Sequence, residues 1–281
     1  MMRDNYRHEP PEIFLPLPPD VYADFHALEM TGYEEDTAFY RHFLGGRETI
    51  LEAGCGCGRL GRRLAALGHQ VVGIDNCLAM LRQACLCLSD RQVPRPTPAS
   101  TAVSAPVSSG FAVAAMDMRR MASAQHFSVA IIAHNTLNLL AGEDEVRQTL
   151  AACRAVIKAD ALLLLHLFLP ETPAPQARHM QFMAMPLPEG GQLLKEIVRH
   201  YAQDGDTMLL TERYKYRPST GRSFFRNYQR QMTLLAWPPE RWRRLFTETG
   251  WHIRFFSVDE PERFPFAADR ALLVTLQKGD E

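Results

Sequence analysis

The chain has 281 residues, of which 46% are hydrophobic and 22% are charged, and its formal net charge is −1. These values are ordinary for a soluble globular protein with a large core. The nearly neutral charge excludes a protein that binds polyanions over its whole surface. Acidic residues are concentrated in residues 1–36 and basic residues in 212–244. Two packed faces, a dimer contact or a pocket for an acidic substrate would each explain this asymmetry.

The sequence contains no segment that predicts a membrane span or an exported protein. The longest apolar stretch, residues 161–170, is too short to cross a bilayer and contains His166. The N-terminus lacks the apolar core of a signal peptide, and six cysteines in a chain of this length do not form a disulfide framework. We therefore expect a cytoplasmic protein. Cys-x-Cys pairs at 55–57 and 85–87 could suggest zinc, but their positions in a glycine turn and a helix favour buried thiols and no metal.

The first 170 residues predict alternating strands and helices after a proline-rich arm over residues 1–19. Helices are expected from Asp20, over residues 34–44 and 59–67, after Asn76, and over 143–158. Strands are expected at residues 50–52, 69–75, 111–117, 127–133 and 161–169. This alternation predicts a parallel sheet with right-handed crossovers, and residues 93–110 read as a flexible surface insertion without periodicity.

The pattern changes after residue 170. A loop over residues 171–191 leads to three strands of a predicted antiparallel meander, at 193–202, 207–217 and 224–235. A helix at 238–249 and strands at 251–258 and 271–277 follow. We therefore divide the chain into an arm (1–19), a core (20–170), an antiparallel lid inserted at 171–236, and a C-terminal return to the core (237–281).

A glycine loop, ILEAGCGCGRL at residues 50–60, is the main functional signal. A strand, a glycine turn and a helix N-terminus together form a cradle of backbone amides for a nucleotide. Residues 56–61 satisfy G-x-G-x-x-G, with Asp75 at the spacing that a dinucleotide fold uses for ribose. However, Glu52 directly before the loop would repel a pyrophosphate. A cationic nucleoside without phosphate fits better, and S-adenosylmethionine is such a ligand, with Asp75 suited to its ribose and Asp117 to its adenine amine.

The same residues carry a resemblance to a known family. Residues 50–60, with VGIDN at 72–76 and AML at 79–81, resemble the class I S-adenosylmethionine-dependent methyltransferases, most of all their small-molecule branch. The resemblance extends from about Tyr22 to the C-terminus. Cys57, Cys77 and the insertion at 93–110 depart from the family pattern. The resemblance implies an α/β fold: a Rossmann-like, seven-stranded, mostly parallel sheet with helices on both faces, plus the antiparallel lid.

The resemblance also implies a set of cofactor contacts. The loop glycines would line the methionine moiety, Asp75 would bind the ribose hydroxyls, and Glu52 would organise the loop. For Asp117 a simple turn cap is the alternative. The complete set of expected cofactor-binding residues is Tyr22, Glu52, Gly54, Cys55, Gly56, Gly58, Asp75, Asn76, Met80, Asp117, Met118 and His134.

The acceptor is less constrained by the sequence. His134, just beyond the fourth strand, is the candidate general base, although it could contribute backbone contacts alone. Its neighbours do not form the Asn-Pro-Pro-Tyr motif of enzymes that methylate nucleic-acid bases. On the lid, Tyr214, Arg226 and Tyr228 are candidate substrate-binding residues, while a dimer face or RNA stacking are alternatives.

The sequence therefore predicts a methyltransferase that transfers the methyl group in line to a small-molecule acceptor, with S-adenosylmethionine as cofactor and no membrane partner. An RNA or protein methyltransferase that uses the basic lid is the first alternative, and a homodimer stays open. The others are a non-catalytic protein that binds the same cofactor, and a nicotinamide enzyme.

Overall fold

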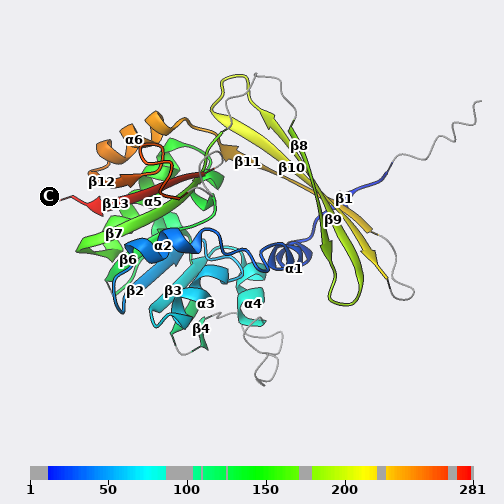
Figure 1. Ribbon diagram of the computed structural model, residues 1–281, viewed down its shortest axis with the longest axis horizontal. Helices are drawn as coiled ribbons and strands as arrows, with labels where there is room; N and C mark the ends of the chain where they lie inside the picture. The colour runs from blue at the N-terminus through cyan, green and yellow to red at the C-terminus, as the bar shows by residue number, and fades with distance from the viewer. Residues whose placement is uncertain are drawn as a thin grey trace, which may run out of the picture.

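Two β-sheets lie side by side in the protein, with one helix between them (Figure 1). The computed structural model describes residues 12–86, 104–108, 110–124, 126–170, 179–219, 226–264 and 271–279. The larger sheet forms the core and the smaller sheet forms the lid. No helix within these ranges combines the length and the apolar character needed to cross a membrane.

The core sheet has eight strands in the order β12-β13-β7-β6-β2-β3-β5-β4. Its central strands are parallel, and both edges are antiparallel. The strands are β2 (Thr49–Ala53), β3 (Gln70–Asp75), β4 (Ser104–Ser108), β5 (Phe111–Ala115), β6 (Phe127–Ile132), β7 (Ile157–Phe168), β12 (Trp251–Phe256) and β13 (Ala271–Lys278). The predicted mostly parallel Rossmann-like sheet is confirmed, with β4 as an additional edge strand.

Helices cover both faces of the core sheet because successive strand residues point to opposite sides. In β6, Ala130 and Ile132 pack with α5 and α6, whereas Val129 and Ile131 pack with α2, α3 and α4. The helices are α2 (Thr37–Phe43), α3 (Arg59–Ala66), α4 (Leu78–Leu86), α5 (Glu143–Val156) and α6 (Pro239–Glu248). The 3₁₀ turns η1 (Met118–Arg120) and η2 (Thr136–Leu139) follow β5 and β6.

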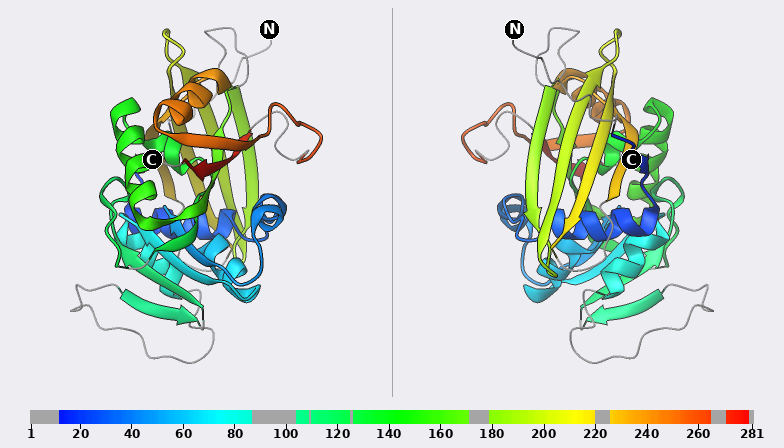
Figure 2. Two further views of the ribbon diagram at one scale, coloured as in Figure 1. Left: turned by 90° about the vertical axis from the view of Figure 1, so that its left-hand side faces the viewer. Right: turned by 90° about the vertical axis from the view of Figure 1, so that its right-hand side faces the viewer.

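The lid is a five-stranded sheet in the order β1-β11-β10-β9-β8. Its strands are β1 (Leu15–Pro16), β8 (His179–Pro186), β9 (Gly191–Tyr201), β10 (Thr207–Pro218) and β11 (Arg226–Leu235). The predicted meander corresponds to β9, β10 and β11. Helix α1 (Pro19–Glu29) lies against the lid, and Figure 2 shows the lid strands running across it. Phe25 of α1 packs on Tyr214 and Tyr228, with ring centroids 5.3 and 6.1 Å apart.

Strands occur in three segments where the sequence predicted none. The predicted loop at 171–191 contains β8, which joins β9 through a tight turn at Gly190 (φ +91°). The predicted arm contributes β1, which pairs with β11. In the predicted insertion at 93–110, β4 pairs with β5, and residues 93–103 lie outside the described residues. Pairing at a sheet edge is a backbone interaction, so a segment without side-chain periodicity can join it.

Candidate active site

A cavity of about 560 Å³ lies where the core, α1 and the lid meet. The core supplies the residues that follow four strands: 54–57 after β2, 75–77 after β3, 116–119 after β5 and 133–136 after β6. From α1 come Tyr22, His26 and Glu29, followed by its C-cap Met30, and from the lid come Lys195, Leu210, Glu212, Arg230, Met232 and Leu234. The cavity is therefore at the carboxyl ends of the parallel strands, where α/β sheets bind ligands, and the lid closes it.

The glycine loop has backbone conformations that require glycine. Gly54, Gly56 and Gly58 have φ of +75°, +53° and +71°. A Cβ on Gly54 would lie 2.2 Å from the Thr136 Cγ2, whereas a Cβ on Gly56 would meet nothing within 4 Å. Gly56 thus presents bare backbone to the cavity. Gly58 does not line the cavity; a Cβ there would lie 2.8 Å from the Phe111 ring, so its small size serves packing beneath α3.

Asp75 is tied to the glycine loop. Its Oδ2 accepts a hydrogen bond from the Gly56 N–H at 2.9 Å, and its Oδ1 accepts one from the Cys77 N–H at 2.8 Å. Burial raises the pKa of this carboxyl, and the backbone donors partly offset that rise. Each carboxylate oxygen keeps a second lone pair. Asp75 can therefore hold the loop and accept ligand hydroxyl groups at the same time.

Asp117 lines the cavity but is already bound by a neighbour. Its Oδ1 accepts a hydrogen bond from the Arg119 N–H at 2.9 Å, which makes Asp117 the N-cap of η1. Its Oδ2 lies 2.6 Å from the Arg119 Nη2. The hydrogen bonds from Arg119 lower the pKa of Asp117 to about 2. The turn-capping alternative is thus observed directly, and a contact with adenine would have to share this carboxylate with Arg119.

Glu52 lines the cavity and is almost completely enclosed, with 2% of its surface exposed. Its Oε2 has no hydrogen-bond partner among the residues that the structure describes. Burial raises its pKa to about 8, although the positive charge of Arg59 acts in the opposite direction. The carboxyl is therefore mostly protonated at neutral pH. The negative charge that the sequence predicts for Glu52 would therefore form at neutral pH only when a cation lies beside the carboxyl.

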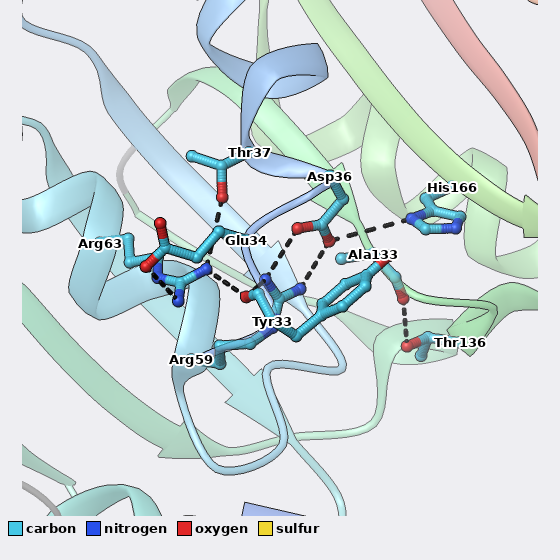
Figure 3. Close-up of polar contacts among 9 residues, drawn as sticks. All are labelled: Tyr33, Glu34, Asp36, Thr37, Arg59, Arg63, Ala133, Thr136 and His166. Atoms are coloured by element: carbon cyan, nitrogen blue, oxygen red, sulfur yellow. Dashed lines mark hydrogen bonds and ion pairs between the residues drawn. The ribbon is translucent and has the colours of Figure 1, made fainter. Parts of the chain in front are cut away.

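A buried ion pair connects the segment before α2 to the helix after the glycine loop (Figure 3). Asp36 is fully buried, and its two oxygens lie 2.8 and 2.6 Å from the Nη1 and Nη2 of Arg59. Burial alone would raise the pKa of Asp36, but hydrogen bonds from His166 and Arg59 lower it to about 2. The Arg59 guanidinium also donates to the Tyr33 carbonyl at 3.3 Å and lies over the Tyr33 ring. This network holds Tyr33 beside the cavity.

His134 lies on the cavity wall in an unusual backbone conformation. His134 and Asn135 have φ of +49° and +64°, a region that costs non-glycine residues roughly 1 kcal/mol or more. The Asn135 N–H donates to the His166 carbonyl at 2.8 Å and stabilises this turn. The imidazole is accessible through the cavity, with the Tyr33 ring 5.6 Å away. Loss of hydration, followed by the charge of His166, lowers its pKa to about 3, so the ring is neutral at physiological pH.

The family described as Methyltransferase domain matches residues 51–165. Residues 51–165 therefore form a methyltransferase domain, consistent with the class I S-adenosylmethionine-dependent methyltransferases that the sequence resembles. S-adenosylmethionine is the cofactor of that family. A search of the curated proteins finds no match to the sequence.

Solved structures match this methyltransferase over nearly its whole length. A methyltransferase from Clostridium acetobutylicum has a TM-score of 0.67 at 13% identity, covering 92% of this chain and 99% of its own. CalS10, an amino pentose methyltransferase from Micromonospora echinaspora, has a TM-score of 0.66 at 18% identity, and the match covers 96% of this chain and 100% of CalS10. The sugar N-methyltransferase KedS8 from Streptoalloteichus has a TM-score of 0.64 at 16% identity, and the match covers 97% of this chain and 98% of KedS8. At these identities the similarity establishes the fold.

Most of the expected cofactor residues of this methyltransferase line the cavity. Gly58 is the exception, for the packing reason given above. The expected lid residues do not line the cavity. Tyr214 and Tyr228 are on the same sheet face as Glu212 and Arg230, but α1 covers that part of the face. Arg226 lies at the exposed end of β11 and bonds to the Tyr228 hydroxyl at 3.3 Å.

The lid wall of the cavity consists instead of a charged cluster that sequence reasoning missed. The Lys195 Nζ lies 2.6 Å from the Glu29 Oε1 and 2.6 Å from the Glu212 Oε1. The Arg230 Nε lies 3.0 Å from the Glu212 Oε2, and its guanidinium lies over the Tyr22 ring, 3.5 Å from the centroid. Because side chains alternate between the two faces of a strand, the sequence could have predicted that Lys195, Glu212 and Arg230 share one face of the lid sheet. Only the packing of α1 against that face identifies which of them reach the cavity.

Proposed function

We propose that this methyltransferase methylates a small polar molecule that is enclosed between the core and the lid. The observation that carries this proposal is the continuity of the cavity, which extends from the glycine loop to the charged lid cluster. The charged cluster of Glu29, Glu212, Lys195 and Arg230 has two acidic and two basic side chains, which suits a polar acceptor without a large net charge. An enclosed site also excludes water from the transfer.

The core half of the cavity fits the cofactor. Gly56 leaves room for close approach of a ligand, and the Asp75 carboxylate has lone pairs left for the ribose hydroxyls. Met80 and Tyr22 supply apolar and aromatic surface beside the loop. When bound there, S-adenosylmethionine supplies an electrophilic methyl group on a sulfonium sulfur. Glu52 would then carry its charge beside a cation, which offsets the cost of burying a carboxylate whose Oε2 has no hydrogen-bond partner within the described residues.

The acceptor half suits an amine or hydroxyl on a small hydroxylated molecule such as an amino sugar. CalS10 is an amino pentose methyltransferase and KedS8 is a sugar N-methyltransferase, and both share this fold. The neutral imidazole of His134 can accept a hydrogen bond or a proton from such a group. Because its pKa is about 3, we infer that His134 orients the acceptor more than it stores a proton.

The basic stretch at residues 212–244, on the lid and α6, gives little support to an RNA acceptor. Most of its cationic side chains already pair with carboxylates: Arg213 with Glu196, Lys215 with Glu12, Arg230 with Glu212, Arg241 with Asp206, and Arg243 with Asp259. Two of these partners, Glu12 and Glu196, lie on the arm and on β9. Paired cations release few counterions on binding phosphate. Lys215 with Glu12 and Lys195 with Glu29 join the acidic N-terminal region to the lid.

A labelled-methyl assay tests the proposed function. The full chain is incubated with S-adenosylmethionine carrying an isotopically labelled methyl group and a panel of amino sugars, polyols, phenols, RNA and peptides. We expect label in at least one amino sugar or related polar small molecule. Labelling of RNA or peptide alone would contradict the proposal. Cofactor binding in calorimetry, without labelling of any acceptor, would support a non-catalytic binding protein instead.

A further inference from the structure

His26 lines the cavity, and the roles described above for the cofactor and the acceptor do not include its imidazole. It lies on α1, one helical turn after Tyr22, with ring centroids 5.5 Å apart, and its side chain lines the cavity. Within the described part of the chain, no hydrogen bond involves either ring nitrogen. An imidazole that is half-buried without polar partners is unfavourable unless water or a ligand satisfies it.

Charged groups face His26 from both the lid and the core. Lys195, Glu212 and Arg230 approach from the lid, and Arg59 approaches from α3. Loss of hydration, followed by the charge of Lys195, lowers the pKa of His26 to about 4. At physiological pH the ring is therefore neutral, with one N–H donor and one nitrogen acceptor.

His26 and His134 both line the cavity, from α1 and from the segment after β6. His26 belongs to α1 and His134 follows β6, and the charge of His26 is among those that lower the pKa of His134. Both rings are neutral for the same physical reasons. Together they offer donors and acceptors without net charge, which is the pattern that hydroxyl and amine groups satisfy best.

We propose that His26 binds the acceptor, donating to and accepting from its hydroxyl or amine groups so that the methyl-accepting atom faces the cofactor. This role rests on the proposed function, because it needs a small polar acceptor in the cavity. His26 lies near both halves of the cavity, because its ring is 5.5 Å from the Tyr22 ring and the charges of Lys195, Glu212 and Arg230 act on it, so a molecule held there also touches the lid wall. A carboxylate or phosphate would use only the donor and leave the acceptor nitrogen unsatisfied.

The test compares two substitutions of His26 with a control on the same helix. His26→Phe keeps a ring but removes both polar atoms, and His26→Gln keeps one donor and one acceptor. The control is Asp24→Asn, because Asp24 is exposed on α1 and does not line the cavity. With the acceptor from the labelled-methyl panel, we expect His26→Phe to raise KM about tenfold, as for one lost hydrogen bond. His26→Gln should recover part of the affinity.

Two readouts separate acceptor binding from a structural role. The dissociation constant for S-adenosylmethionine should stay within about twofold of the unsubstituted protein in all three variants. In the complex with S-adenosylhomocysteine, adding the acceptor should shift the nitrogen-15 resonances of the His26 ring. An unchanged KM for His26→Phe, or unmoved His26 resonances, would overturn the assignment of His26 alone. If no amino sugar or polyol is methylated, the proposed acceptor is wrong, and the role of His26 falls with it.

Discussion

The substitution Glu52→Gln addresses the electrostatics on which cofactor recognition depends. Glu52 is buried on the cavity wall and its pKa is raised to about 8 by loss of hydration. At pH 7 about nine in ten molecules then hold this carboxyl protonated. A cationic ligand favours the carboxylate and lowers that pKa. We therefore predict that S-adenosylmethionine binding releases close to one proton at pH 7.

The size of the effect follows from linkage. The affinity for S-adenosylmethionine should rise with pH, by up to about tenfold per pH unit between pH 6 and 8. The stability of the free protein should move the other way. The folded pKa of about 8 is above the ordinary value of 4.5, so the folded state binds more protons between these values. Stability is highest below pH 4.5 and is lost as pH rises to 8, on the order of 5 kcal/mol in total from this group.

Calorimetry in two buffers with different ionisation enthalpies measures the protons released. Glu52→Gln keeps the shape of the side chain and should abolish the Glu52 share of the release. It should also flatten the pH dependence of stability between pH 5 and 8. Because the ligand ammonium group titrates as well, the difference between the two proteins is the quantity of interest. Equal proton release by both proteins would refute the assignment of a protonated Glu52.

Three further substitutions test the network and the cradle. Asp36→Ala leaves the Arg59 guanidinium half-buried without its carboxylate, and should destabilise the fold by about 3–5 kcal/mol in urea unfolding; a change below 1 kcal/mol would contradict the importance of this pair. Gly54→Ala places a methyl group 2.2 Å from the Thr136 Cγ2 at a φ of +75°; we expect a lower thermal midpoint and weaker cofactor binding, whereas a variant like the unsubstituted protein would show that the loop can shift. Asp75→Ala removes two loop hydrogen bonds and the expected ribose acceptor; the dissociation constant for S-adenosylmethionine should rise at least tenfold, and an unchanged value would reject the ribose assignment.

Local sequence determined the core of this protein. Short apolar runs alternate with amphipathic helices, and this periodicity fixes a wound parallel sheet whose strand ends share one edge. The glycine turn could also be predicted locally, and Gly54 and Gly56 do adopt positive φ values that favour glycine. Asp75 could be placed at the loop from spacing alone, and its hydrogen bond to the Gly56 N–H agrees with that placement.

Tertiary packing decided which lid residues face the cavity. Tyr214 and Tyr228 share a sheet face with Glu212 and Arg230, and the sequence cannot tell these positions apart. Helix α1 crosses that face and covers the two tyrosines with Phe25. The strands β1 and β8 likewise depend on pairing at an edge, which needs a neighbouring strand more than a side-chain pattern.

Protonation was also decided by the three-dimensional structure. From the sequence, Glu52 is expected to carry a negative charge and His134 to act as a general base. Neighbouring segments change both, since loss of hydration favours the neutral form of each group: the carboxyl pKa rises to about 8 and the imidazole pKa falls to about 3. The sequence by itself determined where the cradle lies and which residue types surround it. Only the fold determined their charge states, because hydration is lost through contacts between segments that are distant in the chain.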